Sequence, residues 1–246
     1  MDKPAAEAEV RREPFFKLPG VILLLLAIMA AVQLFLSLQS DTEQLAIVSK
    51  YGLVPSRYSG PSGLHLHGPL SLWLPFVTHL FLHGNFPHIA FNALWLMAVG
   101  TPLARRVGTL PFLGFYIACG VLSAVGHILG NLGSNEIVIG ASGAVSGCMA
   151  GALRVMYSPD ARYFSTRDVR VGSLAPLWDI RIIFVTIVWI AINALMGSGL
   201  VPIPGADGAG IAWEAHIAGF FAGLIILPFF DLLAGRGSAI LPKLPS

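Results

Sequence analysis

Charged residues are scarce in this sequence. Asp, Glu, Lys and Arg together make up 11% of its 246 residues, whereas soluble globular domains carry about 25%. Hydrophobic residues make up 55%, and the mean hydropathy is +0.75. This composition excludes an ordinary soluble domain and indicates an integral membrane protein. A net charge of +2, with no basic face interleaved with aromatic residues, also disfavours a nucleic-acid partner.

Cysteines and intramembrane carboxylates are lacking as well. The two cysteines, Cys119 and Cys148, lie in apolar segments and indicate neither a disulfide framework nor a metal site. No Asp or Glu falls in the middle of an apolar segment, and no inverted repeat is visible. A transporter or channel would favour one or the other. The sequence therefore disfavours that class.

Six apolar segments approach the roughly 20 residues that a helix needs to cross a bilayer. They cover residues 20–39, 85–104, 109–130, 137–156, 180–197 and 211–233. Period-2 alternation is missing, so the spans are expected to be helices. The sequence predicts an all-α integral membrane protein, a compact bundle of six transmembrane helices. Residues 1–19 would form an N-terminal cytoplasmic segment, residues 20–233 the membrane core and residues 234–246 a short cytoplasmic tail.

The basic residues predict the orientation. All of them except Lys50 and Arg57 fall in segments on the same side of the membrane as the N-terminus. Because Lys and Arg favour the cytoplasmic side, both termini are expected in the cytoplasm. The compact core fits a multi-pass protein of the cell membrane, such as a bacterial inner membrane.

A few polar residues remain at membrane depth, where they are costly and usually face the interior of the bundle. Ser142 lies about five residues into its segment, or roughly 8 Å at 1.5 Å per residue. His216 lies about five residues into the last segment, so the two are expected at matching depth near the outer face. The other polar residues of this kind are His79, His83, His88, Asn92, His127, Ser146 and Asn193.

Small residues predict that the helices of Ser142 and His216 touch. Gly143 and Gly147 are four residues apart on the fourth segment, as are Gly219 and Gly223 on the sixth. Such spacing lets membrane helices approach closely. A histidine in contact with a serine can take its hydroxyl proton and make it a nucleophile. Because no carboxylate lies at this level, the sequence predicts a dyad.

His88 and Asn92 provide a third element. They are four residues apart, so they share one helical face near the outer end of the second segment. Pro87 suits the first turn of that helix. Two donors on one face, with the backbone N–H of Ser142, are suited to stabilise a tetrahedral oxyanion.

These three motifs, His83-x4-His88-x3-Asn92, Gly140-Ala141-Ser142-Gly143 and Ala215-His216-Ile217-Ala218-Gly219, resemble those of the rhomboid family of intramembrane serine proteases. The resemblance implies that Ser142 is the nucleophile and His216 the general base. It implies that His88 and Asn92 line the oxyanion hole and that His83 holds the outer loop by hydrogen bonding.

The resemblance further implies a water-filled site that is open to the outside and a helix or loop that moves to admit a substrate. The partners would be transmembrane protein substrates and the lipid bilayer, and no cofactor or metal is expected.

The sequence departs from the family at two places. Trp73 is followed by Leu74 and Pro75, where rhomboids often have Trp-Arg, and Ser146 stands where many have an aromatic that packs on the catalytic imidazole. The histidine would then be held by a hydroxyl or more loosely. The alternative function is a weak or inactive rhomboid-like protein that binds transmembrane clients.

Four polar residues also receive default interpretations. His79 and His83 could in isolation bind a metal. Two histidines without a nearby Cys, Asp or Glu supply too few ligands for a typical metal site, so a structural role is favoured. His127 and Asn193 are expected to pack inside the bundle.

Overall fold

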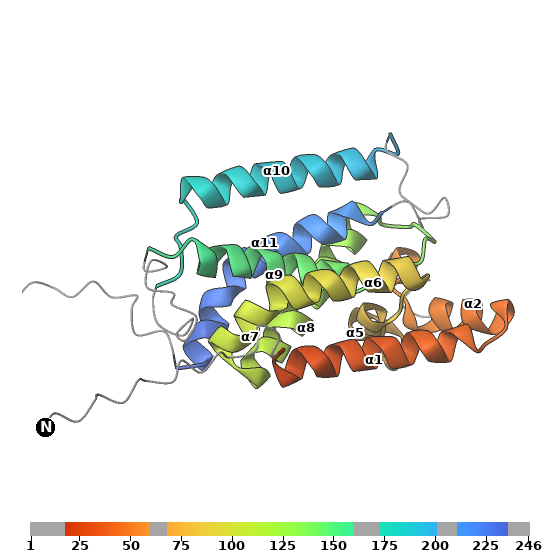
Figure 1. The fold of residues 1–246 in the computed structure, drawn as a ribbon. Helices are drawn as coiled ribbons and strands as arrows, with labels where there is room; N and C mark the ends of the chain where they lie inside the picture. Colours follow the sequence, from red (N-terminus) through yellow and green to blue (C-terminus); the bar gives the residue numbers. More distant parts are fainter. Residues whose placement is uncertain (1–17, 60–67, 160–172, 201–210, 236–246) are drawn as a thin grey trace, which may run out of the picture.

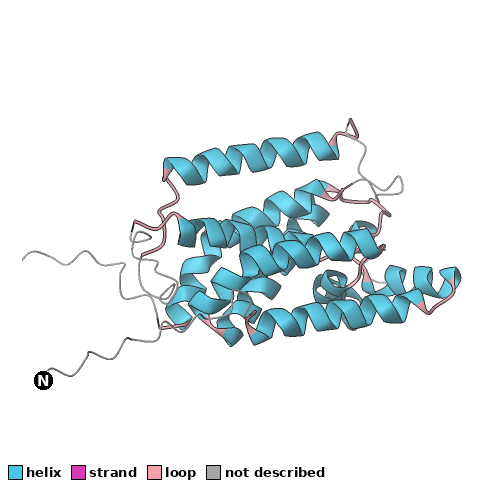
Figure 2. Cartoon of the chain, in the orientation of Figure 1, coloured by secondary structure: helices cyan, strands magenta, loops and turns pink. Residues whose placement is uncertain are grey.

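The computed structural model describes residues 18–59, 68–159, 173–200 and 211–235. Within these ranges the regular secondary structure is helical, apart from an isolated antiparallel bridge between Leu53 and Val138, and loops join the helices (Figure 2). The terminal segments expected in the cytoplasm lie mostly outside the described residues.

Four helices in the described ranges are long and apolar enough to cross a membrane. Two of them, α8 (Thr109–Gly130) and α10 (Ile180–Gly197), have the bounds predicted from the sequence. The other two, α1 (Gly20–Ser37) and α11 (Trp213–Leu233), differ from the prediction by two residues at one end. Large apolar side chains such as Leu23, Phe184 and Ile225 are exposed on these helices, as expected for surfaces that face lipid.

The second predicted segment is interrupted. It consists of α6 (Phe86–Trp95), a π-helical turn η3 (Leu96–Gly100) and α7 (Thr101–Val107). The side chain of Asn85 caps α6 by accepting a hydrogen bond from the backbone N–H of His88, at 2.9 Å. Pro87 lies in the first turn of α6, as predicted.

The predicted start of the fourth segment at Ile137 is wrong, because α9 (Ser142–Met156) begins five residues later. Val138 is extended and exchanges two backbone hydrogen bonds with Leu53, at 2.8 and 3.0 Å. Gly140 has a φ of +120°, a backbone conformation that residues other than glycine rarely adopt. The helix therefore starts only after this turn, with Ser142 as its first residue.

The outer segment between α1 and α6 contains helices that hydropathy does not reveal. The longest is α2 (Asp41–Tyr51), whose N-terminus has a capping box between Ser40 and Glu43. The short helices are η1 (Pro55–Tyr58), α4 (Pro69–Trp73), α5 (Pro75–Thr78) and η2 (His79–Phe81).

Side-chain hydrogen bonds tie the outer segment together. The hydroxyl of Tyr58 donates to the carbonyl of Leu72 at 2.8 Å, and the hydroxyl of Thr78 donates to the carbonyl of Tyr51 at 2.6 Å. These bonds anchor the segment on both sides of Leu74.

The helices α8, α9 and α11 form the centre of the bundle, with α10 along one side and α1 along the other (Figure 1). Glycines make the contact between α9 and α11. A methyl group added at Gly219 would overlap the carbonyl of Gly143, and one at Gly223 would overlap that of Gly147. The predicted close approach of these two helices is therefore confirmed.

An ion pair joins α7 to the far end of α11. The guanidinium of Arg106 donates to both carboxylate oxygens of Asp231, at 2.7 and 2.8 Å, and both side chains are buried. Arg154 lies at the same end and donates to the carbonyls of Ala175 and Leu224. The fold thus places buried arginines at the end of the bundle opposite to Ser142.

Candidate active site

Ser142 and His216 are in direct contact. Ser142 is the first residue of α9 and His216 the fourth residue of α11, and the glycine contacts hold the two helices together. The distance between Ser142 Oγ and His216 Nε2 is 2.8 Å. The expected depth of five residues within the helix is wrong for Ser142, because the preceding residues are not helical. The expected proximity of the two side chains is nevertheless present.

A third side chain completes this arrangement. His216 Nδ1 lies 2.8 Å from Asn193 Oδ1 on α10, and Asn193 Nδ2 donates to the carbonyl of Trp189 at 2.9 Å. The interpretation of Asn193 as interior packing is therefore incomplete. A usable signal was present, since Asn193 lies four residues before the end of α10, close to the level of His216 in α11.

Ser146 does not take the place of the missing aromatic. Its hydroxyl donates to the carbonyl of Ser142 at 2.8 Å, within its own helix. Of the two expected arrangements, a hydroxyl holding the histidine or a looser histidine, neither is found. The amide of Asn193 holds the imidazole instead.

His88 and Asn92 lie on α6 and face the turn before Ser142. A methyl group at Gly140 would lie 2.7 Å from His88 Nε2 and 3.9 Å from Asn92 Nδ2. Asn92 is buried, and Nδ2 donates one of its two hydrogens to the carbonyl of His88 at 3.1 Å. Its second hydrogen remains for another acceptor. Two side-chain donors thus converge on the segment that leads into the nucleophile's helix.

The backbone N–H groups at the start of α9 lie next to the same turn, the one at Gly140. The first N–H groups of any helix have no partner within it, and they carry the positive end of the helix dipole. Here the first intrahelical bond of α9 runs from Val145 to the carbonyl of Ala141, at 2.9 Å. Ser142 therefore combines its hydroxyl with an N–H suited to bind an anion.

The two histidines His79 and His83 support the turn around Gly140. The backbone N–H of Gly140 donates to the carbonyl of His79 at 2.9 Å, and that of Ala141 lies 3.5 Å from His83 Nε2. His79 Nδ1 lies 2.7 Å from the carbonyl of Pro75. Within the described ranges, no group of three or more His, Cys, Asp or Glu side chains is arranged to hold a metal ion.

The other intramembrane histidine contacts the start of α11. His127 Nδ1 lies 3.4 Å from Glu214 Oε2 and 3.3 Å from Asn131 Nδ2. These contacts tie α8 to α11 at the end of the bundle that carries Ser142, consistent with the packing role expected for His127.

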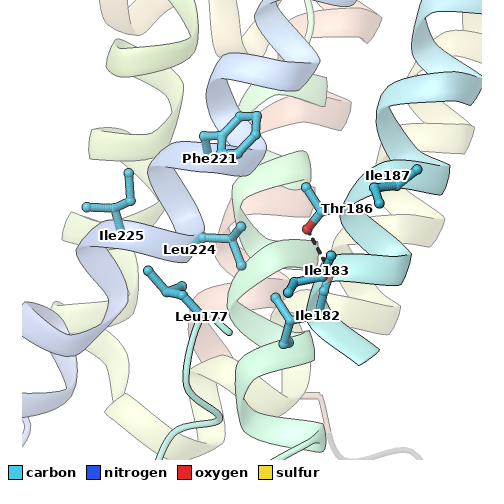
Figure 3. A pocket seen from close by; sticks show the side chains of 8 residues that line it. All are labelled: Leu177, Ile182, Ile183, Thr186, Ile187, Phe221, Leu224 and Ile225. Atoms are coloured by element: carbon cyan, nitrogen blue, oxygen red, sulfur yellow. Dashed lines mark hydrogen bonds between the residues drawn. The ribbon is translucent and has the colours of Figure 1, made fainter. Parts of the chain in front are cut away.

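An apolar groove of about 290 Å³ lies between α10 and α11, away from these residues (Figure 3). The hydroxyl of Thr186 donates within its own helix, to the carbonyl of Ile182, at 2.8 Å. Apolar side chains form the rest of the lining: Leu177, Ile182, Ile183, Ile187, Phe221, Leu224 and Ile225. The groove offers no group for chemistry.

Residues 71–230 match the family model described as Rhomboid domain, and the chain therefore belongs to the rhomboid family. Together with its apolar helices, this makes it a multi-pass helical membrane protein.

Curated relatives agree with this membership. The chain is 36% identical over 94 residues to Rhomboid protease GluP of Bacillus subtilis, covering 38% of this chain and 18% of that protein. It is 35% identical over 80 residues to Rhomboid-type serine protease 2 of Emericella nidulans, covering 32% of this chain and 15% of that protein. It is 30% identical over 159 residues to Rhomboid-related protein 2 of Mus musculus, covering 61% of this chain and 46% of that protein. The matches thus span less than half the length of each of these three relatives.

Proposed function

We propose that this protein is an intramembrane serine endopeptidase that hydrolyses a peptide bond in or near a transmembrane segment of its substrates. Ser142 is the nucleophile and His216 the general base. The observation that carries the proposal is the 2.8 Å contact between Ser142 Oγ and His216 Nε2. This is the distance at which an imidazole can take the hydroxyl proton as the oxygen attacks.

In the first half of the reaction, Ser142 Oγ attacks the carbonyl carbon of the scissile peptide while its proton passes to His216 Nε2. The tetrahedral intermediate then collapses, and the bond between carbon and nitrogen breaks. The leaving nitrogen takes the proton from His216 Nε2 and departs as an amine, and the acyl group stays on Ser142 as an ester.

In the second half, a water molecule replaces the amine. His216 Nε2 takes a proton from the water as its oxygen attacks the ester carbon. Collapse of this second intermediate returns the proton to Ser142 Oγ and releases a carboxylic acid. Both halves use the same pair of atoms, and the scheme requires no cofactor.

The negative oxygen of each intermediate is stabilised by Asn92 Nδ2, His88 Nε2 and the backbone N–H of Ser142. The orientation of His88 and Asn92 toward Gly140 supports this role. Donors that are already oriented before the reaction stabilise the oxyanion without the cost of reorganisation, and one such donor contributes roughly 10²-fold to the rate. His83 is a supporting residue that positions the turn.

The membrane topology follows from the same arrangement. We infer six spans within residues 20–233, formed by α1, α6 to α7, α8, α9, α10 and α11, with residues 1–19 and 234–246 in the cytoplasm. Arg154 lies twelve residues after Ser142 in α9, about 18 Å along the helix axis. Because arginines favour the cytoplasmic side, the site opens toward the outer face of the cell membrane, which we infer to be a bacterial inner membrane.

The chemistry also limits the substrate. Peptide carbonyls in a regular helix are already hydrogen-bonded and shielded from attack. We therefore expect the cleaved bond to lie where small or helix-breaking residues loosen a transmembrane helix. The partners are membrane proteins, and nothing in the site is suited to a nucleic acid.

A fluorophosphonate probe tests the proposal without a known substrate. The purified protein in detergent would be treated with the probe, and the adduct would be mapped by mass spectrometry. We expect labelling at Ser142 that is lost in Ser142→Ala and in His216→Ala. Ser146→Ala is the matched control, because it removes a neighbouring hydroxyl that is bonded within α9, and it should still be labelled.

Cleavage of a transmembrane substrate in liposomes provides the second readout. The wild type should cut it and Ser142→Ala should not. A folded wild-type protein that takes no label and cuts no substrate would contradict the proposal and favour a client-binding relative.

A further inference from the structure

Asn193 is an unusual residue for its helix. Of the 18 residues of α10, Ile182 and Asn193 are the buried ones, and Asn193 is 1% exposed. A buried polar side chain in a membrane helix is costly unless it forms hydrogen bonds. Asn193 forms two, and both can be assigned a direction.

The first bond fixes the orientation of the amide. Asn193 Nδ2 lies 2.9 Å from the carbonyl oxygen of Trp189, which can only accept a hydrogen bond. The other end of the amide, Oδ1, therefore faces His216 Nδ1 at 2.8 Å. Turning the amide around would place two oxygens against each other.

The second bond then fixes the imidazole. An amide oxygen has no hydrogen to donate, so His216 Nδ1 must carry the proton. In the neutral ring, this leaves a lone pair on Nε2, which lies 2.8 Å from Ser142 Oγ. This is the tautomer that a general base for Ser142 requires.

We infer that Asn193 is a positioning residue that holds His216 in the reactive tautomer and orientation, an inference that rests on the proposed function. The site then consists of three hydrogen-bonded side chains, Ser142, His216 and Asn193, although the sequence predicts a dyad. Asn193 acts through His216 and touches no reacting atom. Its oxygen also stabilises the charged imidazolium that forms during each step, because Nδ1–H is then a stronger donor.

Neighbouring residues support this role. The rings of Trp189 and Phe220 stack one helical turn away from the bond between Asn193 and His216, with centroids 5.8 Å apart and planes at 21°. This stack keeps α10 and α11 at the spacing that the hydrogen bond needs. Ser146, the residue that could otherwise steady the ring from α9, uses its hydroxyl within its own helix.

Two substitutions separate positioning from simple structural support. Asn193→Leu keeps the side-chain size and removes the acceptor, whereas Asn193→Asp keeps an acceptor at Oδ1 and removes the donor to Trp189. Thr186→Val is the matched control, since it removes another polar group of α10 that is bonded within the helix. The rate of fluorophosphonate labelling at Ser142 would be measured for all of them.

The tautomer of His216 would be read directly by 15N NMR of the ring in detergent micelles. We expect a protonated Nδ1 and an unprotonated Nε2 in the wild type and in Asn193→Asp, and a mixture of tautomers in Asn193→Leu. The labelling rate should fall about tenfold or more in Asn193→Leu. It should fall less in Asn193→Asp, which keeps the acceptor but places its second oxygen against the carbonyl of Trp189, and it should stay close to that of the wild type in Thr186→Val.

The outcomes distinguish this inference from the proposed function. A labelled wild type with an equally fast Asn193→Leu variant would overturn the inference and leave the protease proposal standing. So would a proton on Nε2 of the wild-type ring. A wild type that takes no label but has the expected tautomer, which is lost in Asn193→Leu, would contradict the protease proposal and support the positioning role.

Discussion

Gly219 of α11 lies directly against the carbonyl of Gly143 of α9, so closely that the smallest side chain does not fit between them. Gly143 follows Ser142, and Gly219 follows His216 by three residues. The contact therefore sets the distance between the two helices at the level of the proposed nucleophile and base.

Gly219→Ala should separate α9 from α11. Overpacking of a tight core costs about 1–3 kcal/mol, so the variant should unfold at lower temperature and lose labelling at Ser142. Gly20→Ala serves as the control, because a methyl group there meets nothing within 4 Å. Labelling at the wild-type rate in Gly219→Ala would show that the distance between the helices does not depend on this contact.

Gly140→Ala should disturb the proposed oxyanion hole. The residue has a φ of +120°, and its new methyl group would lie 2.7 Å from His88 Nε2. We expect a fall in turnover beyond what backbone strain alone causes. Gly133→Ala isolates the strain, since Gly133 also has a positive φ, of +84°, but open space around it. Equal effects of the two variants on turnover would argue against a role for His88.

Asn92→Ala should reduce kcat by roughly 10²-fold while KM changes little, because the lost donor acts on the transition state. Asn131→Ala is matched to it. Both amides donate to the backbone carbonyl four residues earlier, at 3.1 and 3.0 Å, but Asn131 lies at the end of α8 next to His127. If kcat fell equally in the two variants, Asn92 would have no special part in catalysis.

Asp231→Leu should destabilise the fold by about 3–5 kcal/mol, because it leaves the buried guanidinium of Arg106 without its carboxylate. The double variant Arg106→Met with Asp231→Leu should recover most of the loss, because neither member of the pair then leaves the other charge buried without its counter-ion. Thermal unfolding in detergent measures both. Arg105→Met, at an exposed neighbouring position, should change little. A double variant as unstable as the single one would mean that the pair itself, and not the orphaned charge, sets the stability.

The parts of the fold that the sequence predicts best are those determined by local composition. The apolar runs of α8 and α10 end at the predicted residues, because the composition changes sharply there. The start of α9 could not be found in this way. Apolar residues continue through Gly140 without a break, and the extended backbone before it is set by pairing between Val138 and the distant Leu53.

The candidate site is predictable from the sequence where residues of different motifs lie at similar positions within their apolar segments. Ser142 and His216 are predictable because each lies in a motif and both are expected near the starts of their segments, on the same side of the membrane. The sequence indicates that Asn193 is polar and buried, and its partner follows only when the level of the end of α10 is compared with that of the start of α11. The helix α2 was also missed, although Ser40 and Glu43 form a local capping signal.

The high exposure of α10 has a consequence for how this chain tolerates mutation. Ten of its 18 residues are exposed, so most exchanges of one apolar residue for another should be neutral at those positions. At position 193, by contrast, a single nucleotide change can remove the acceptor that faces the imidazole. Saturation mutagenesis scored for proteolysis should thus show little effect at the exposed positions of α10, a strong effect at Asn193 and weaker effects at Ile182 and Trp189.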